Sequence, residues 1–148
     1  MVSERIVSDA LVSELESTGA PIGDGEQPSG TGWQGTPGQS TFVGYIVVHC
    51  ISGGISDGTL AAAHDDPQYI YQLSCHGATR AQAQLLADLS RPVMLGFRNV
   101  ALDGIQVMHV DVEMEGGSRR VDTIQPAQYQ AVPRYRVYAT PGPALSAS

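Results

Sequence analysis

The stretch from residue 19 to residue 40 constrains the fold of this chain more than any other part. It contains seven glycines, three prolines and the only tryptophan, Trp33. Glycine has too much backbone freedom, and proline lacks a ladder donor, so such a stretch cannot sustain a helix or an interior strand. We expect one long loop, and loops of this length inside compact domains are usually functional or disordered. A tryptophan is unusual in a disordered linker, which favours a functional loop.

Two strand-like segments follow this loop. Phe42–Ile51 is apolar almost throughout, which predicts a strand covered on both faces at the centre of a sheet. Residues 52–67 then carry Gly-Gly and Asp-Gly turn signals and predict a second long loop. Gln68–Gly77 alternates and predicts a half-buried strand. Its expected buried face consists of Tyr69, Tyr71, Leu73 and Cys75.

Two segments have helical periodicity. Residues 3–17 place Val7, Leu11 and Leu15 on one narrow apolar stripe. The second predicted helix begins with a capping-box pattern, Thr79-Arg-Ala-Gln. Its expected apolar stripe consists of Leu85, Leu86, Leu89 and Val93. Pro92 is expected to end or kink this helix near Arg91.

The last third predicts three more strands. Ile105–Met114 alternates, a Glu-Gly-Gly-Ser sequence follows it, and Arg119–Ile124 returns, which is the pattern of a β-hairpin. Arg134–Thr140 predicts a last strand, and residues 141–148 are expected to be a flexible tail.

The order of these elements predicts an α+β fold. We expect one mostly antiparallel sheet of about four to five strands, two helices packed on one face, and long Gly-rich loops. A chain of 148 residues fits a single domain, here residues 1–140.

Charge and hydropathy exclude several classes of function. The net charge is −7, and the eight basic residues, all arginines, are spread thinly along the chain, which argues against tight nucleic-acid binding. No window approaches the roughly 18 apolar residues of a membrane span, and no signal peptide is evident, so we expect a soluble protein made in the cytosol. Cys50 and Cys75 lie in apolar runs, where we expect reduced, buried thiols.

The candidate chemical sites are weak. Two Cys and two His in His49-Cys50 and Cys75-His76 suggest zinc, but adjacent strand residues point to opposite faces, so neither pair chelates as a unit. Cys50, Cys75 and His109 remain as an alternative metal set, against the favoured reading of two buried thiols. The sequence also lacks a P-loop and a nucleophile elbow. We therefore expect no catalytic, cofactor or metal site.

The remaining acidic and aromatic residues have simpler interpretations. Asp111, Glu113 and Glu115 lie two apart and favour a solvated strand face over an acid/base pair. The aspartates of the second loop lack calcium-site spacing and suggest a charged projection. Trp33 is either tucked onto the flank of the domain or an interface anchor. The candidate interface residues are Trp33, Asp57, Asp65, Asp66, Arg119 and Arg120.

Several segments together resemble a known family. They are the N-terminal helix, the loop from Ile22-Gly-Asp-Gly to Gly32-Trp-Gln-Gly, the strand Tyr45–Cys50, the run Tyr71–Ala83 into the second helix, and the closing Arg-Tyr-Arg-Val-Tyr from residue 134. Over residues 4–140 the chain resembles the tail terminator proteins of long-tailed phages, in the form found in actinobacterial phages and prophages. The likeness rests on element order and soft motifs, without a catalytic signature.

The resemblance implies a structural protein and not an enzyme. Such a subunit forms a closed ring, typically of six, on the end of the finished tail tube. It contacts the major tail tube protein, stops tube polymerisation and presents a surface to the neck of the head. It would be assembled in the host cytoplasm and reside in the virion, with DNA passing through the ring without specific binding. The alternatives are another neck or tail-completion protein, or a small ligand- or metal-binding α+β domain.

Overall fold

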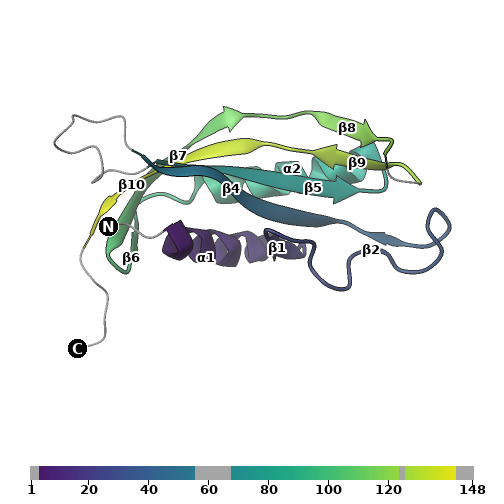
Figure 1. The fold of residues 1–148 in the computed structure, drawn as a ribbon, viewed down its shortest axis with the longest axis horizontal. Coiled ribbons are helices and arrows are strands. Elements are labelled where there is room, and N and C mark those ends of the chain that lie inside the picture. Colours follow the sequence, from purple (N-terminus) through teal and green to yellow (C-terminus); the bar gives the residue numbers. More distant parts are fainter. Residues whose placement is uncertain (1–3, 56–67, 124–125, 143–148) are drawn as a thin grey trace.

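The computed structural model describes residues 4–55, 68–123 and 126–142 (Figure 1). It contains two α-helices, a short 3-10 helix and ten strands in the described residues. In chain order they are α1 (Glu4–Leu15), the 3-10 helix (Glu16–Thr18), β1 (Ile22–Asp24), β2 (Gly32–Trp33), β3 (Phe42–Val43), β4 (Tyr45–Ile55), β5 (Gln68–Gly77), α2 (Arg80–Leu95), β6 (Val100–Leu102), β7 (Ile105–Met114), β8 (Ser118–Val121), β9 (Gln128–Ala131) and β10 (Arg134–Pro141).

Helix α1 buries the stripe that its periodicity predicts. Val7, Leu11 and Leu15 are fully buried. The chain leaves the helix through a 3-10 turn, where Gly19 adopts a left-handed φ of 82° and its N–H donates to the carbonyl of Glu16. The predicted apolar face of this helix is confirmed.

Helix α2 starts as predicted but ends later. The Thr79 hydroxyl accepts from the Gln82 N–H at 3.1 Å, as in a capping box. The helix continues through Pro92 to Leu95, so it does not end near Arg91, which was one of the two outcomes expected for this proline. Met94, beyond the proline, is fully buried, and this packing offsets the hydrogen bond that proline cannot make.

The apolar stripe of α2 also differs from the prediction. Leu85 and Leu89 are 56% and 41% exposed. The buried residues of the helix are Ala83, Leu86, Ala87, Ser90 and Met94. The small Ala83, Ala87 and Ser90 side chains face the sheet, and we attribute this to close packing of the helix against β5, which favours small residues there.

The sheet is larger than the expected four to five strands, and that expectation is wrong. Eight strands form one curled, mixed sheet in the order β1-β4-β5-β10-β7-β6, with β9 also pairing β5 and β8 pairing β9. β1 is parallel to β4, and the other ladders are antiparallel. β2 and β3 form a separate two-stranded sheet. Four strands, β1, β2, β6 and β9, were not predicted, because their two to four residues are too short to show periodicity.

The expected central position of the strand in residues 42–51 is corrected as well. β4 lies next to the terminal strand β1, whereas β5 and β10 occupy the centre. β4 is apolar on both sides because Ile46 and Val48 face the helices while Tyr45 and Val47 join a second, smaller cluster on the opposite face. A doubly covered strand therefore need not be a central one.

The predicted hairpin within residues 105–124 is wrong. β7 pairs with β10, and β8 pairs with β9. Together β7 and β8 form one long strand with an interruption, and β9 and β10 form a second one. The connection between these two long strands begins after Val121. Gly116-Gly117 lies in the interruption of the first strand and Val132-Pro133 in that of the second, so the Gly-Gly sequence belongs to a bulge-like break and not a turn.

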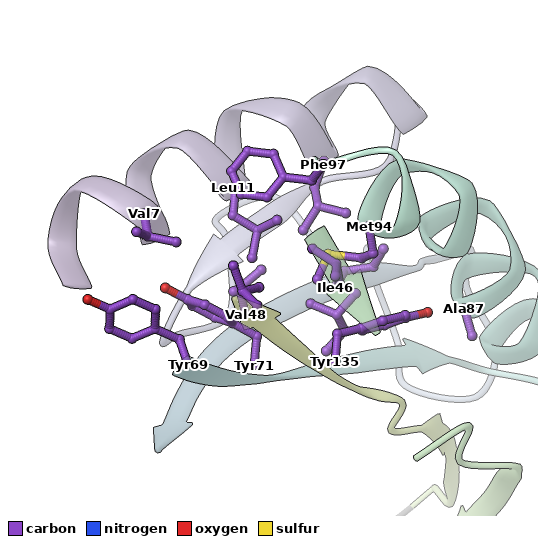
Figure 2. Packing of buried hydrophobic residues seen from close by; sticks show 14 of the residues in the cluster. Val7, Leu11, Ile46, Val48, Tyr69, Tyr71, Ala87, Met94, Phe97 and Tyr135 are labelled. Carbon is purple, nitrogen blue, oxygen red and sulfur yellow. The ribbon is translucent and has the colours of Figure 1, made fainter. Parts of the chain in front are cut away.

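The main core lies between the helices and one face of the sheet. Figure 2 shows Val7 and Leu11 of α1 and Met94 of α2 pointing toward Ile46 and Tyr71 of the sheet. The predicted buried face of β5 is confirmed, since Tyr69, Tyr71, Leu73 and Cys75 are at most 1% exposed. Neither described helix is long and apolar enough to cross a membrane.

Candidate assembly surface

The sheet face that points away from α1 and α2 is the candidate surface, called here the open face. Strand alternation puts every second side chain of β5, β10 and β7 on it. Both described helices pack on the Tyr71 side of the sheet, and neither covers this face (Figure 1). No described helix therefore covers the polar side chains of the open face.

A network of long polar side chains covers the middle of the open face. The Arg136 guanidinium donates to both carboxylate oxygens of Glu113, at 2.9 and 3.0 Å, and to Gln68 Oε1 at 2.6 Å. Arg134 Nε donates to Gln72 Oε1 at 3.1 Å. The hydrogen bond from Arg136 lowers the pKa of Glu113. These contacts join β5, β10 and β7 and hold the side chains in defined positions.

An aromatic row covers one end of the open face. Trp33 meets Phe42 edge-on with ring centroids 5.1 Å apart, Phe42 stacks on Tyr45 at 6.3 Å, and Tyr45 stacks on His76 at 4.6 Å. Burial raises the pKa of Tyr45. Burial, with a smaller contribution from His49, lowers the pKa of His76, so the imidazole is neutral near pH 7.

Trp33 is therefore packed on the flank of its own domain, the first of the two alternatives for this residue. Its ring remains half-buried, and Nε1 is buried without a hydrogen-bond partner among the described residues. An unpaired buried donor costs about 1–3 kcal/mol, so the contact is not optimised within the subunit. The interface role of Trp33 stays a prediction.

The strand interruptions at Gly116-Gly117 and Val132-Pro133 create a hollow on each face of the sheet. A Cβ at Gly116, whose φ is 63°, would lie 2.5 Å from the carbonyl oxygen of Val132, so this position requires glycine. On the open face the hollow measures about 380 Å³. It is lined by Gln72, Met114, Gly116, Gly117, Arg119, Gln130, Val132 and Arg134.

The second hollow lies on the helix face, measures about 200 Å³ and is lined by α2 and the same interruption. Arg91 of α2 and Glu115 form an ion pair across it. The spacing of Asp111, Glu113 and Glu115 predicts that all three lie on one strand face. In the structure Glu115 is separated from the other two. Asp111 lies 3.5 Å from His109, and Glu113 pairs with Arg136, so the three carboxylates have three different partners.

The structure separates the predicted interface residues. Arg119 lines the open-face hollow, while its neighbour Arg120 pairs with Asp122 at 2.7 Å. Trp33 lies at the aromatic row. The aspartates of the second predicted loop, Asp57, Asp65 and Asp66, lie outside the described residues.

The cysteines behave differently from one another. Cys75 is buried, which raises the pKa of its thiol to about 12, whereas Cys50 is exposed, so the expectation of a buried thiol is wrong for Cys50. Both are free. Across residues 4–55, 68–123 and 126–142, no three His, Cys, Asp or Glu side chains converge as a metal site would require.

A small cluster of hydroxyls lies inside the core between α1 and β5. The Ser8 hydroxyl and the Tyr71 phenol are 2.8 Å apart, and Tyr71 also donates to Glu4 at 3.4 Å. Burial raises the pKa of Tyr71 far above its usual range, so the phenol stays protonated. The Ser8 hydroxyl also donates to the Glu4 carboxylate, and these contacts join α1 to β5.

Sequence reasoning missed the open-face hollow and its residue Arg134. The signal was present in the closing Arg-Tyr-Arg-Val-Tyr sequence, where arginines alternate with buried residues. Gly116-Gly117 was noticed, but its role depends on Val132-Pro133, a partner that no local pattern identifies.

The fold and surface define a two-layer domain with a mixed sheet, helices on one face and an organised polar surface on the other. No protein-family model matches this chain, and no curated protein matches it either.

Proposed function

We propose that this protein is a structural subunit of a phage tail, which forms a ring on the tail tube, stops tube polymerisation and provides the surface that joins the tail to the head. The family likeness of residues 4–140 supports this proposal. The observation that carries it furthest is the asymmetry of the sheet, which offers two chemically different edges together with an open polar face.

A closed ring needs two different, complementary patches on each subunit, because every copy contacts its neighbours head to tail. One edge of the sheet is formed by β1, which pairs only with β4 among the described strands. The other runs along β7 beyond its pairing with β6 and continues into β8, which pairs only with β9. These edges carry different residues, so they suit a head-to-tail contact better than a two-fold one.

The open face suits a contact with another subunit or another tail protein. Its side chains are already held by mutual hydrogen bonds, so binding a partner would order few further rotamers. The ring would contact the tube protein on one side and a neck protein on the other.

Deletion of the gene from the phage or prophage tests the proposal. Electron microscopy of lysates should show tails of uncontrolled length, or tails that do not join heads, and a plasmid copy of the gene should restore normal particles. Tails of normal length that fail only at head joining would favour the related role of a neck or tail-completion protein. Normal infectious virions without the gene would refute both roles.

A further inference from the structure

The hollow on the open face contains two arginines without an acidic partner. Arg5, Arg91, Arg120 and Arg136 each pair with a carboxylate. Within the described part of the chain, Arg80, Arg98, Arg119 and Arg134 have no ion pair. Arg80 donates to Ser118 Oγ at 3.0 Å, and of these four arginines Arg119 and Arg134 line this hollow. On a chain with a net charge of −7, two unneutralised guanidinium groups at one depression form a local site of opposite sign.

The lining of the hollow fits a carboxylate. Arg134 is half-buried and is held by Gln72 through Nε, which leaves its terminal amino groups for a ligand. Gln130 adds an amide to the lining, while Met114 and Val132 supply apolar surface for the stem of a side chain. Guanidinium groups bind carboxylates with two parallel hydrogen bonds, and partial burial strengthens such contacts.

An acidic pair lies at the opposite edge of the sheet. Asp24 ends β1, and Glu26 follows it by two residues. Both are exposed, and neither has an ion pair within the described part of the chain. The molecule therefore presents a basic hollow near one edge and two free carboxylates at the other.

The two patches lie in the same row of the sheet. Asp24 is in register with Val48, and Val48 with Leu73. The N–H of Leu73 donates to the carbonyl of Pro133 at 3.0 Å. Pro133 follows Val132, which lines the open-face hollow at the interruption. In a ring that closes without a helical rise, the two complementary patches of a subunit lie at the same height along the ring axis. If the ring axis runs along the strands, patches in one row of the sheet meet this condition.

We propose that the open-face hollow of one copy binds Asp24 and Glu26 of the next copy, with Arg119 and Arg134 as the cationic ligands. The inference rests on the proposed ring and names the contact that closes it. Opposite charges at the two ends of one sheet row also fix the direction in which copies join, because hollow against hollow and edge against edge are both repulsive.

Charge exchange in the full chain tests this contact. Arg119→Glu/Arg134→Glu gives every copy an acidic hollow, and Asp24→Arg/Glu26→Arg gives every copy a basic edge. Each variant alone should associate roughly 100-fold more weakly than the wild type in sedimentation equilibrium, because like charges now meet. An equimolar mixture should recover association near the wild-type level, since each variant complements the other at both contacts.

Two further variants serve as controls. Arg5→Glu/Arg98→Glu changes the net charge equally but away from both patches, and it should associate as the wild type does at physiological salt. Arg119→Gln/Arg134→Gln removes the attraction without adding repulsion and should weaken association less than the glutamate variant. Circular dichroism of every variant checks that it is folded, and the glutamine variant replaces the glutamate variant if the latter is not.

Three results would overturn the inference: unchanged association of the charge variants, no recovery in the mixture, or a wild-type chain that stays monomeric at every concentration. Loss of binding to a duplex DNA oligonucleotide in the Arg119→Glu/Arg134→Glu variant would identify a phosphate site instead, and would also overturn it. None of these results changes the outcome of the gene deletion, so the contact and the proposed function can fail separately.

Discussion

The two faces of the sheet are built from alternate residues of the same strands, yet they differ in almost every physical respect. On β5, Tyr71 faces the helices and is fully buried, whereas the next residue, Gln72, faces away and bonds to Arg134. The helix face excludes water and holds few polar groups: Ser8 and Tyr71 contact each other, whereas the Tyr69 phenol is buried without a hydrogen-bond partner among the described residues. On the open face, long polar side chains form hydrogen bonds with one another at the surface.

This difference separates stability from recognition. Burial of apolar surface is the main favourable term in folding, and most of the buried residues lie on the helix face. The open face contributes less, because exposed ion pairs are weak in water. Its residues can therefore change to suit a partner at little cost in stability. Substitutions on the two faces should accordingly differ in their effect on stability.

The largest effect should come from the helix face. Leu11→Ala removes a fully buried side chain between α1 and the sheet and should lower the free energy of unfolding by about 3 kcal/mol. Leu89→Ala, the same change at a 41% exposed position of α2, should cost less than about 0.5 kcal/mol. Urea denaturation measures both, and equal losses would contradict the assigned packing.

The interruption between β7 and β8 should come next. Gly116→Ala should destabilise the protein by about 2 kcal/mol, because its φ of 63° is strained for alanine and the new Cβ meets the backbone of Val132. Gly117→Ala is the matched control, since a Cβ there meets nothing within 4 Å. Similar melting temperatures for the two variants would show that the break is not formed as described.

The ion pair of the open face should have a smaller effect that depends on pH. The folded-state pKa of Glu113 is lowered by Arg136, so the stabilisation is present above the unfolded pKa, about 4.3, and is lost as the pH falls through the folded value. Glu113→Gln should remove this part of the acid sensitivity. Glu14→Gln, on the exposed surface of α1, is the control. Denaturation midpoints between pH 3 and pH 7 should separate the two variants.

The smallest effect should arise at the aromatic row. Burial lowers the pKa of His76, so protonation favours the unfolded state, and stability falls as the pH drops below the unfolded value of about 6.5. His76→Phe keeps a ring against Tyr45 and should remove this loss between pH 7.5 and pH 5.5. Fluorescence of Trp33, the only tryptophan, follows the row directly, and an unchanged pH profile in the variant would count against the assignment.

The sequence predicted those parts of the fold whose signal is local and long. The stripe of α1, the alternation of β5 and the cap at Thr79 were all identified, since each follows from a period or a short spacing. Short strands such as β1 and β9 were not predicted. They form through pairing with β4 and β5, and their own residues show no strand pattern. Pro92 was misleading for a related reason, since tertiary packing beyond it outweighs the local penalty.

The candidate surface was less predictable than the fold. An interface was expected but could not be placed, and Arg119 and Arg120 were predicted together although Arg120 pairs with Asp122 and Arg119 lines the open-face hollow. The hollow depends on two interruptions that lie far apart in sequence and opposite each other in space. Such a coincidence requires the register of the sheet, which no single-sequence pattern supplies.

The position of β10 has a consequence for how the chain folds. It is the last described strand to be synthesised, yet it lies between β5 and β7 near the centre of the sheet. Until it arrives, the backbone donors and acceptors of both neighbours remain open, and unpaired edges of this kind readily capture other chains. Closing the sheet also requires contacts of long sequence separation, which slow folding. The protein should therefore depend on chaperones or low concentration during synthesis more than its size would suggest.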